Sequence, residues 1–395
     1  RKTASQPWQA IAQRFCSIRV CRVKKMEMML LEECCEILDS MRIPITASNR
    51  KEGIYPYYGA NGIQDHVADY IFDDELVLLT EDGGNFGSKT RPIAYRVSGK
   101  CWVNNHAHVL KPKEGLNVDF LCYSLMFYNT EGLVNGATRQ KLTQTTMRKM
   151  LIPNLSIENQ LYIVNQLNKL LKIIELRKKE IQQLDNLTKA RFVEMFGTLD
   201  TPTQAFEKAT LKELCNKITD GKHGGCKSEV GTERYFVGAR EIYDDDVHYE
   251  SAPEINIEEF EKDYKRCNVE IGDFLIVNTG ATIGKSAIAC DKRTEHTLLQ
   301  KSVALLKVKK DVLNPIFLKW CYRVNTKMYM VENASAQPNL LLSKINATVI
   351  YVPDIELQNQ FADFVHQVDK SKVAVQKALD ETQMLFYSLM QEYFG

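Results

Sequence analysis

A glycine-containing loop that ends in Lys-Ser is the segment most suggestive of chemistry. Residues 279–286 read Thr-Gly-Ala-Thr-Ile-Gly-Lys-Ser and follow a strand-like apolar run. A phosphate-binding P-loop needs four residues between its glycines and a helix after them, because backbone N–H groups and the helix N-terminus hold the phosphates. Here Gly280 and Gly284 enclose three residues, and residues 287–289 predict a strand. The pattern favours a tight turn that brings backbone N–H groups and Lys285 near nucleic-acid phosphates; a P-loop-like nucleotide-binding enzyme is the alternative.

Two further motifs lack the partners that catalysis would need. Asn314-Pro315-Ile316-Phe317 approaches the adenine-clamping motif of methyltransferases but has no second proline, and Asn-Pro is typical of a helix start. His106 and His108 lie two residues apart on a predicted strand and would face the same side. No Asp, Glu or His at ligand spacing accompanies them. We therefore expect no catalytic residue and no metal site in this chain.

The elements that must position these residues occur twice. Residues 152–161 (IPNLSIENQL) recur as residues 352–361 (VPDIELQNQF), which is an offset of 200. Each copy precedes about 35 residues with apolar side chains at steps of three, four and seven, typical of a coiled-coil helix, and each helix ends at Phe-Gly. We expect two long helices that pair antiparallel.

The repeat continues upstream of each helix. Strand-like runs at 76–80 and 274–278 precede glycine-containing loops, and further strand-like segments follow in the same order. The same order with different loop residues indicates one scaffold that carries two different binding surfaces. We expect a mixed α/β (α+β) protein with an internal pseudo-two-fold repeat. Its parts are a leader outside the fold (1–29), a first domain (30–154), a long helix (155–197), a second domain (209–352) and a second long helix (353–395).

Composition restricts the classes of function. The eleven cysteines include no CxxC pair, which favours reduced thiols in a cytoplasmic protein, and no apolar run reaches the roughly 18–20 residues of a membrane span. The net charge is +1, but residues 1–25 hold seven Lys or Arg and no acidic residue. The remainder has 44 basic against 50 acidic residues. Binding to DNA would therefore depend on local basic loops and on partner proteins.

The order of the segments resembles the specificity subunits of type I restriction–modification systems. The similarity extends over the chain after about Leu30, whereas the leader has no counterpart. The similar segments are 36–45 (EILDSMRIPI), 55–63 (YPYYGANGI), 81–84 (EDGG), 102–108 (WVNNHAH), 218–223 (ITDGKH), 279–284 (TGATIG) and 337–340 (QPNL).

This resemblance implies a non-catalytic DNA-recognition subunit. Each domain would be a target-recognition domain for one half of a split double-stranded DNA site, and the helices would set the spacing and bind two adenine methyltransferase subunits. Motor-nuclease subunits would join that assembly. S-adenosylmethionine, ATP and Mg²⁺ would be used by the partners, with no cofactor bound by this chain. A coiled-coil assembly scaffold without sequence specificity is a further alternative.

The candidate DNA-binding residues lie in polar loops of both domains. Arg and Lys contact guanine or phosphate, and Asn and Gln pair with adenine. In the first domain they are Asn61, Asn85, Lys89, Arg91, Asn104, Asn105, Thr138, Arg139, Gln140 and Lys141. In the second domain they are Lys222, His223, Arg240, Thr282, Lys285, Gln300, Lys301, Gln337 and Asn339.

Overall fold

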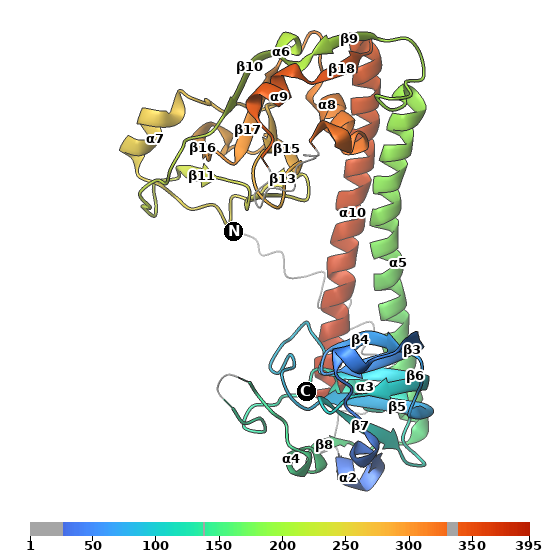
Figure 1. The fold of residues 1–395 in the computed structure, drawn as a ribbon. Coiled ribbons are helices and arrows are strands. Elements are labelled where there is room, and N and C mark those ends of the chain that lie inside the picture. The colour runs from blue at the N-terminus through green and yellow to red at the C-terminus, as the bar shows by residue number, and fades with distance from the viewer. Residues whose placement is uncertain (1–26, 137–138, 330–338) are drawn as a thin grey trace, which may run out of the picture. The chain divides into compact units, whose positions relative to one another are not determined.

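The computed structural model describes residues 27–136, 139–329 and 339–395 (Figure 1). Residues 1–26 of the expected leader and the candidates Thr138 and Gln337 lie outside the described residues. The chain divides into two compact units. Unit 1 comprises residues 1–176 and 379–395, and unit 2 comprises residues 177–378. Each unit therefore contains one domain and part of each long helix.

Unit 1 is built around a six-stranded sheet in the order β2-β7-β5-β6-β3-β4. Neighbouring strands are antiparallel except β3 and β6, which are parallel. Helix α3 packs on β5 and β6, and buried side chains such as Leu76, Leu78 and Val109 form the core. The strands of the sheet are β2 (Cys35–Ile37), β3 (Glu52–Gly59), β4 (Gly62–Val67), β5 (Phe72–Thr80), β6 (Ala94–Val103) and β7 (Ala107–Pro112). The other elements are β1 (Met28–Leu30), which pairs with β8 (Leu151–Pro153), and α2 (Leu31–Cys34), η1 (Asp39–Met41), η2 (Ala47–Asn49), α3 (Val118–Met126) and α4 (Gln144–Arg148).

Unit 2 contains an antiparallel sheet in the order β10-β17-β14-β15 and a separate parallel pair, β11 with β16. These strands are β10 (Cys215–Asp220), β11 (Tyr235–Val237), β14 (Phe274–Val277), β15 (Ser286–Ile288), β16 (Thr297–Leu299) and β17 (Val303–Val308). Two antiparallel pairs complete the strands: β9 (Glu207–Thr210) with β18 (Val349–Val352), and β12 (Ile242–Tyr243) with β13 (Asp246–Val247). The helical segments are α6 (Leu211–Leu214), α7 (Ile257–Tyr264), η3 (Thr294–His296), α8 (Pro315–Val324), η4 (Thr326–Met328) and α9 (Leu342–Ala347).

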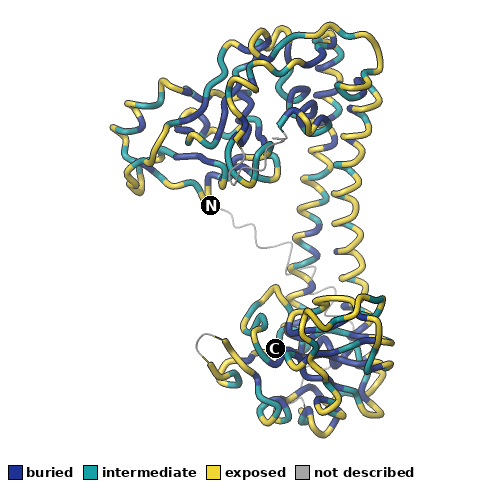
Figure 2. The backbone as a smooth tube through the Cα atoms, viewed as in Figure 1, coloured by how far each residue is buried: buried dark blue, intermediate teal, exposed yellow. Residues whose placement is uncertain are grey.

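The two expected long helices are present as α5 (Ile157–Phe196) and α10 (Ile355–Phe394), each of 40 residues. In unit 2 they pair antiparallel: Asp185 contacts Lys372, and further along α5 the Arg191 guanidinium lies over the ring of Phe364. Buried and half-buried positions recur among exposed ones along both helices (Figure 2). In the described part of the chain, no helix has an apolar stretch long enough to span a membrane.

Two buried glutamines show how the repeats align. The Gln160 carbonyl accepts from the Asn117 N–H (2.8 Å), and its amide donates to the carbonyl of Leu155 (2.8 Å). Gln358 makes the same contacts to the Asn314 N–H (2.9 Å) and to the carbonyl of Pro353 (2.7 Å).

The two glutamines and the carbonyls to which their amides donate are therefore 198 positions apart, as are the two ends of both helices. The offset of 200 taken from the sequence is wrong by two residues. It aligns Pro153 with Pro353, whereas the hydrogen bonds align Leu155 with Pro353.

Candidate nucleic-acid interface

Backbone hydrogen bonds at the end of β5 bring three loops of the first domain together. The Glu81 N–H donates to the His106 carbonyl (2.9 Å), and the Leu142 N–H donates to the Glu81 carbonyl (2.7 Å). Asp82 forms a β-bridge with Lys141. Loop 82–87 therefore lies between the turn before β7 and the segment before α4.

Several first-domain candidates converge on this point. The Asn61 amide donates to the Gly83 carbonyl (3.3 Å), and the Asn85 amide donates to Asn61 Oδ1 (3.2 Å). The Gln140 carbonyl accepts from the Gly83 N–H (3.1 Å). Lys141 pairs with Glu81 (3.0 Å), while half of its side chain stays exposed. The exposed polar atoms of these loops can therefore contact one common ligand.

The remaining first-domain candidates differ in accessibility. Asn104 is 3% exposed, and its amide group contacts Gln64 (3.1 Å) and the His106 N–H (2.8 Å). A base contact through Asn104 would require these hydrogen bonds to break. Asn105 is exposed in the same turn, and Lys89 and Arg91 are exposed after loop 82–87.

The second domain repeats this set of backbone contacts around its loop, the loop closure. The Asn278 N–H donates to the Ser302 carbonyl (3.0 Å), the Leu340 N–H donates to the Asn278 carbonyl (2.7 Å), and Thr279 forms a β-bridge with Asn339. Loop 279–285 is thereby held beside the turn at residues 300–302. The closure brings Thr282, Lys285, Gln300, Lys301 and Asn339 to one end of the domain.

Lys222 and His223 lie beside this turn. The Lys222 carbonyl accepts from the Lys301 N–H (2.9 Å), and its ammonium group pairs with Asp263 (2.6 Å). His223 is exposed and lies 3.6 Å from Asp220. Lys222 would have to exchange Asp263 for a phosphate, whereas His223 is directly accessible.

The candidates of the two domains occupy equivalent positions. The Asn104 N–H donates to the Tyr58 carbonyl (3.0 Å), and the Gln300 N–H donates to the Val237 carbonyl (2.8 Å). Each of these acceptor residues is followed by Gly-Ala and then by a candidate DNA-binding residue, which is Asn61 in the first domain and Arg240 in the second. The two closures align the following pairs: Asn61 with Arg240, Asn85 with Thr282, Asn104 with Gln300, Asn105 with Lys301, and Lys141 with Asn339. One scaffold thus presents different polar side chains at the same places.

The segments that suggested enzyme chemistry have structural roles. Loop 279–285 joins two antiparallel strands, and Ser286 pairs with Ile276 in the sheet. A strand therefore stands where a P-loop requires a helix, and the nucleotide-binding alternative has no support. Asn314 caps α8 through the Ile316 N–H (2.8 Å), as expected for an Asn-Pro helix start.

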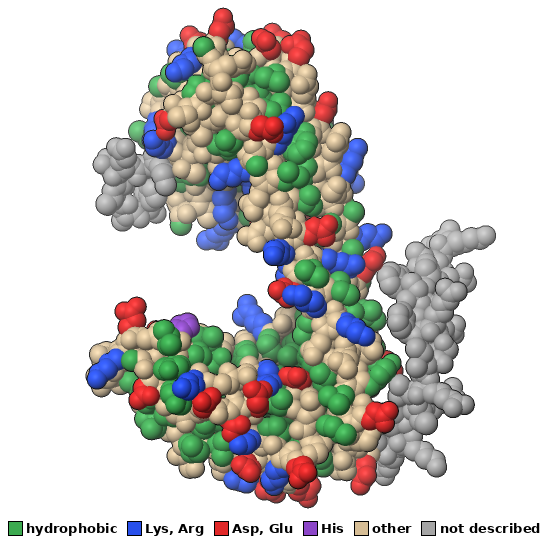
Figure 3. Space-filling view, turned by 90° about the vertical axis from the view of Figure 1, so that its right-hand side faces the viewer, with side chains coloured by type: hydrophobic (Ala, Val, Ile, Leu, Met, Phe, Trp, Pro, Cys, Tyr) green, Lys and Arg blue, Asp and Glu red, His purple; other side chains and the backbone are tan. Residues whose placement is uncertain are grey.

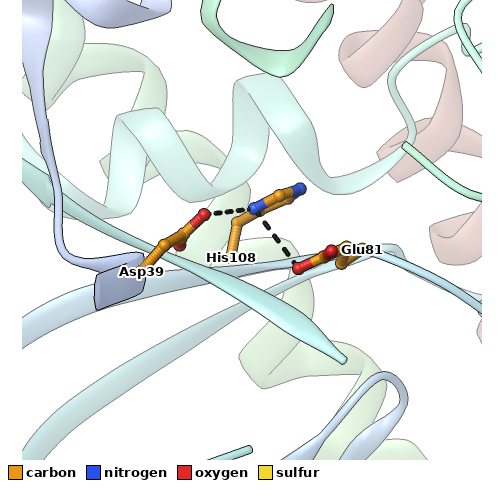
Figure 4. A group of neighbouring side chains, drawn as sticks. All are labelled: Asp39, Glu81 and His108. Carbon is orange, nitrogen blue, oxygen red and sulfur yellow. Dashed lines mark hydrogen bonds and ion pairs between the residues drawn. The ribbon is translucent and has the colours of Figure 1, made fainter. Parts of the chain in front are cut away.

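A buried cluster of Asp39, Glu81 and His108 lies beneath loop 82–87 (Figure 4). His108 Nδ1 is 2.6 Å from Asp39 Oδ2, and Nε2 is 2.9 Å from the Leu142 carbonyl. Both ring nitrogens face oxygen acceptors, so both contacts are hydrogen bonds only when the imidazole is protonated. No carboxylate stands at ligand spacing from His108 in the sequence, but strand pairing brings Asp39 and Glu81, distant in the sequence, next to it.

The cluster is a charge network whose ligand atoms are already occupied by protein contacts. Burial acts to raise the pKa of Asp39, but hydrogen bonds from His108, the Val109 N–H and Gln144 hold that pKa below its ordinary value. Burial likewise opposes the charge of Glu81, and Arg42 and Lys141 hold its pKa low. The network fixes the base of loop 82–87.

The face shown in Figure 3 carries no large area of one charge. Lys and Arg side chains are interspersed with Asp and Glu side chains on the visible faces of both units (Figure 3). This distribution agrees with a net charge of +1. Any contact with phosphates would therefore depend on individual loops rather than on a broad basic field.

A family model decides the classification. The model of the type I restriction modification DNA specificity domain matches residues 23–186 and 204–382. The chain belongs to this family. Each match covers most of one domain and the helix that follows it, so the repeat is a repeat of the family domain.

Two curated relatives agree over part of their length. A type I restriction enzyme specificity subunit of Haemophilus influenzae is 39% identical over 140 residues, which are 35% of this chain and 36% of that protein. The EcoprrI specificity subunit of Escherichia coli is 28% identical over 116 residues, 29% of this chain and 28% of that protein. The matched segments thus span about a third of these relatives.

Two solved structures share the fold. The S subunit of a type I restriction-modification system from M. genitalium aligns over 96% of this chain and 98% of its own, with a TM-score of 0.58 and 15% identity. A chain from a structural study of complex assembly and conformational transition of the type I R-M system aligns over 95% and 99%, with a TM-score of 0.55 and 15% identity. Both confirm the mixed helix and sheet architecture.

Proposed function

We propose that this chain recognises a bipartite DNA sequence for a type I restriction–modification complex, with each domain contacting one half-site. The observation that carries the proposal is the equivalence of the two loop closures. Asp82 bridges Lys141 in one domain and Thr279 bridges Asn339 in the other, so a common scaffold displays different side chains. Different donors and acceptors at equivalent places would select different bases.

The chemistry would belong to partner subunits. Two adenine methyltransferase subunits would bind this chain and use S-adenosylmethionine, and motor-nuclease subunits would use ATP and Mg²⁺. The family assignment and the strand that replaces a P-loop helix after Lys285 support a role without catalysis in this chain. Its near-neutral charge further suggests that the partners contribute to DNA affinity.

Co-expression with the cognate methyltransferase subunits, followed by genome-wide mapping of N6-methyladenine, tests the proposal. We expect one asymmetric motif with two specified halves and a fixed gap, and no such methylation when this chain is omitted. A continuous motif would contradict the proposal. So would methylation or ATP hydrolysis by the purified chain alone.

A further inference from the structure

Arg139 is held in place by an acidic side chain at the end of β5. Its Nη2 lies 2.7 Å from Asp82 Oδ1, and the same oxygen lies 2.8 Å from His106 Nδ1. The side chain of Arg139 is 60% exposed, whereas that of Asp82 is 16% exposed. Among the described residues, the polar contacts found for the guanidinium all involve Nη2.

The backbone around Arg139 is fixed as well. The Asn135 N–H donates to the Lys141 carbonyl (3.0 Å), and the Lys141 N–H donates back to the Asn135 carbonyl (2.7 Å). Gly83 has φ +63°, and a Cβ atom on it would lie 3.2 Å from Arg139 Nε. The guanidinium therefore lies so close over Gly83 that a Cβ there would require it to shift by a few tenths of an ångström.

This arrangement suits contact with a base better than contact with a phosphate. An arginine fork fixed at one nitrogen can present its remaining N–H groups to the O6 and N7 atoms of guanine. The carboxylate of Asp82 would repel a phosphate nearby, so it is costly at a site meant only for backbone binding. The Asp82 carboxylate instead orients the guanidinium of Arg139.

The second domain carries no charged pair at the described positions equivalent to Asp82 and His106. The closure aligns Thr279 with Asp82 and Ser302 with His106, and neither side chain carries a charge. An effect that depends on Asp82 would therefore be restricted to the half-site contacted by the first domain.

We propose that Asp82, assisted by His106, is a positioning residue that directs Arg139 to a guanine in the first domain's half-site. The inference rests on the proposed function. Arg139 then makes the base contact, and Asp82 does not contact DNA directly.

A double-mutant cycle in the reconstituted complex tests the inference. Methylation rates are measured on the cognate site and on sites with each single substitution in the two half-sites. Arg139→Ala should reduce discrimination at one guanine position, on the order of tenfold. Asp82→Asn should reduce base discrimination at the same position. The double variant should discriminate as Arg139→Ala alone does, because Asp82 acts through Arg139.

A conservative variant separates base contact from charge. Arg139→Lys keeps the positive charge but loses the planar guanidinium. It should therefore reduce base discrimination at the same position and leave the salt dependence of binding unchanged. Uniform weakening on all sequences by Arg139→Ala, with a smaller salt slope, would show a phosphate contact and overturn the inference. Additive effects of Asp82→Asn at a different base would show that Asp82 itself contacts DNA, which also overturns it.

Two glycines of the same loop supply a matched pair. Gly83→Ala and Gly87→Ala impose similar strain, since the φ values are +63° and +73°. A Cβ at Gly87 would meet no atom within 4 Å, whereas one at Gly83 would require the Arg139 guanidinium to shift by a few tenths of an ångström. Only Gly83→Ala should reduce discrimination. If the wild-type complex methylates a bipartite motif and these variants do not differ, the inference fails while the proposed function stands.

Discussion

One buried glutamine connects each long helix to the domain that precedes it in the chain. Gln160 and Gln358 are 1% and 0% exposed, and each bonds the backbone before a domain helix and the carbonyl that precedes its own helix. A buried polar side chain with three backbone partners is costly to replace, because all three groups would be left without partners.

Gln358→Leu should therefore lower the free energy of unfolding by about 2–4 kcal/mol. Gln360→Leu is the matched control, because the sequence repeat aligns Gln360 with Gln160, yet Gln360 is exposed. Its effect should stay within about 0.5 kcal/mol. Equilibrium urea unfolding of the full chain measures both. A large loss for Gln360→Leu with a neutral Gln358→Leu would support the offset of 200 instead.

Individual residues also show what the sequence can predict about the candidate site. Polar loops were identifiable because Asn85 and Thr282 follow the repeated strand-like runs at 76–80 and 274–278. The cluster of Asp39, Glu81 and His108 was not, since its members are 42 and 27 residues apart and meet only through the pairing of β2, β5 and β7. The positions of Asp82 and His106 beside Arg139 depend on the same pairing.

At the element scale, the long helices were the most predictable part of the fold. Forty residues without proline or glycine and with a regular apolar seam specify a helix strongly. The sheets were harder to predict from the sequence. Strand β3 pairs in parallel with β6 across more than 40 residues, and several strands have only two or three residues. Short strands carry too little periodicity to be found without their partners.

The helices also allow a prediction about the gap between half-sites. Four helical residues inserted after Arg177 in α5 and four after Ala378 in α10 lengthen both helices at facing positions, since Arg177 donates to the Ala378 carbonyl. The insertion adds about 6 Å, at about 1.5 Å per residue. At about 3.4 Å per base pair, the gap in the methylated motif should widen by one or two base pairs.

The sequences of the half-sites should not change in this variant. Insertion into α5 alone is the control, because it lengthens one helix and not its partner at the Arg177–Ala378 contact and should reduce stability instead. A motif with an unchanged gap after the paired insertion would show that the helices do not determine the spacing.

At the scale of the whole molecule, the chain consists of two units with equivalent closures and different exposed side chains. The family domain matches each half separately, which agrees with two independent recognition modules in one chain. A coiled-coil scaffold without specificity would have no reason to maintain two polar loop closures. We therefore expect the two domains to recognise their DNA sequences independently.

The independence of the two domains is tested by the methylated motif that a variant of the second domain produces. Replacing Thr282, Lys285 and Lys301 with alanine removes three exposed or half-exposed side chains while leaving the first domain intact. Mapping of N6-methyladenine should show one half of the motif degenerate, with the other half and the gap unchanged. Loss of specificity in both halves, or an unaltered motif, would contradict independent recognition by the two domains.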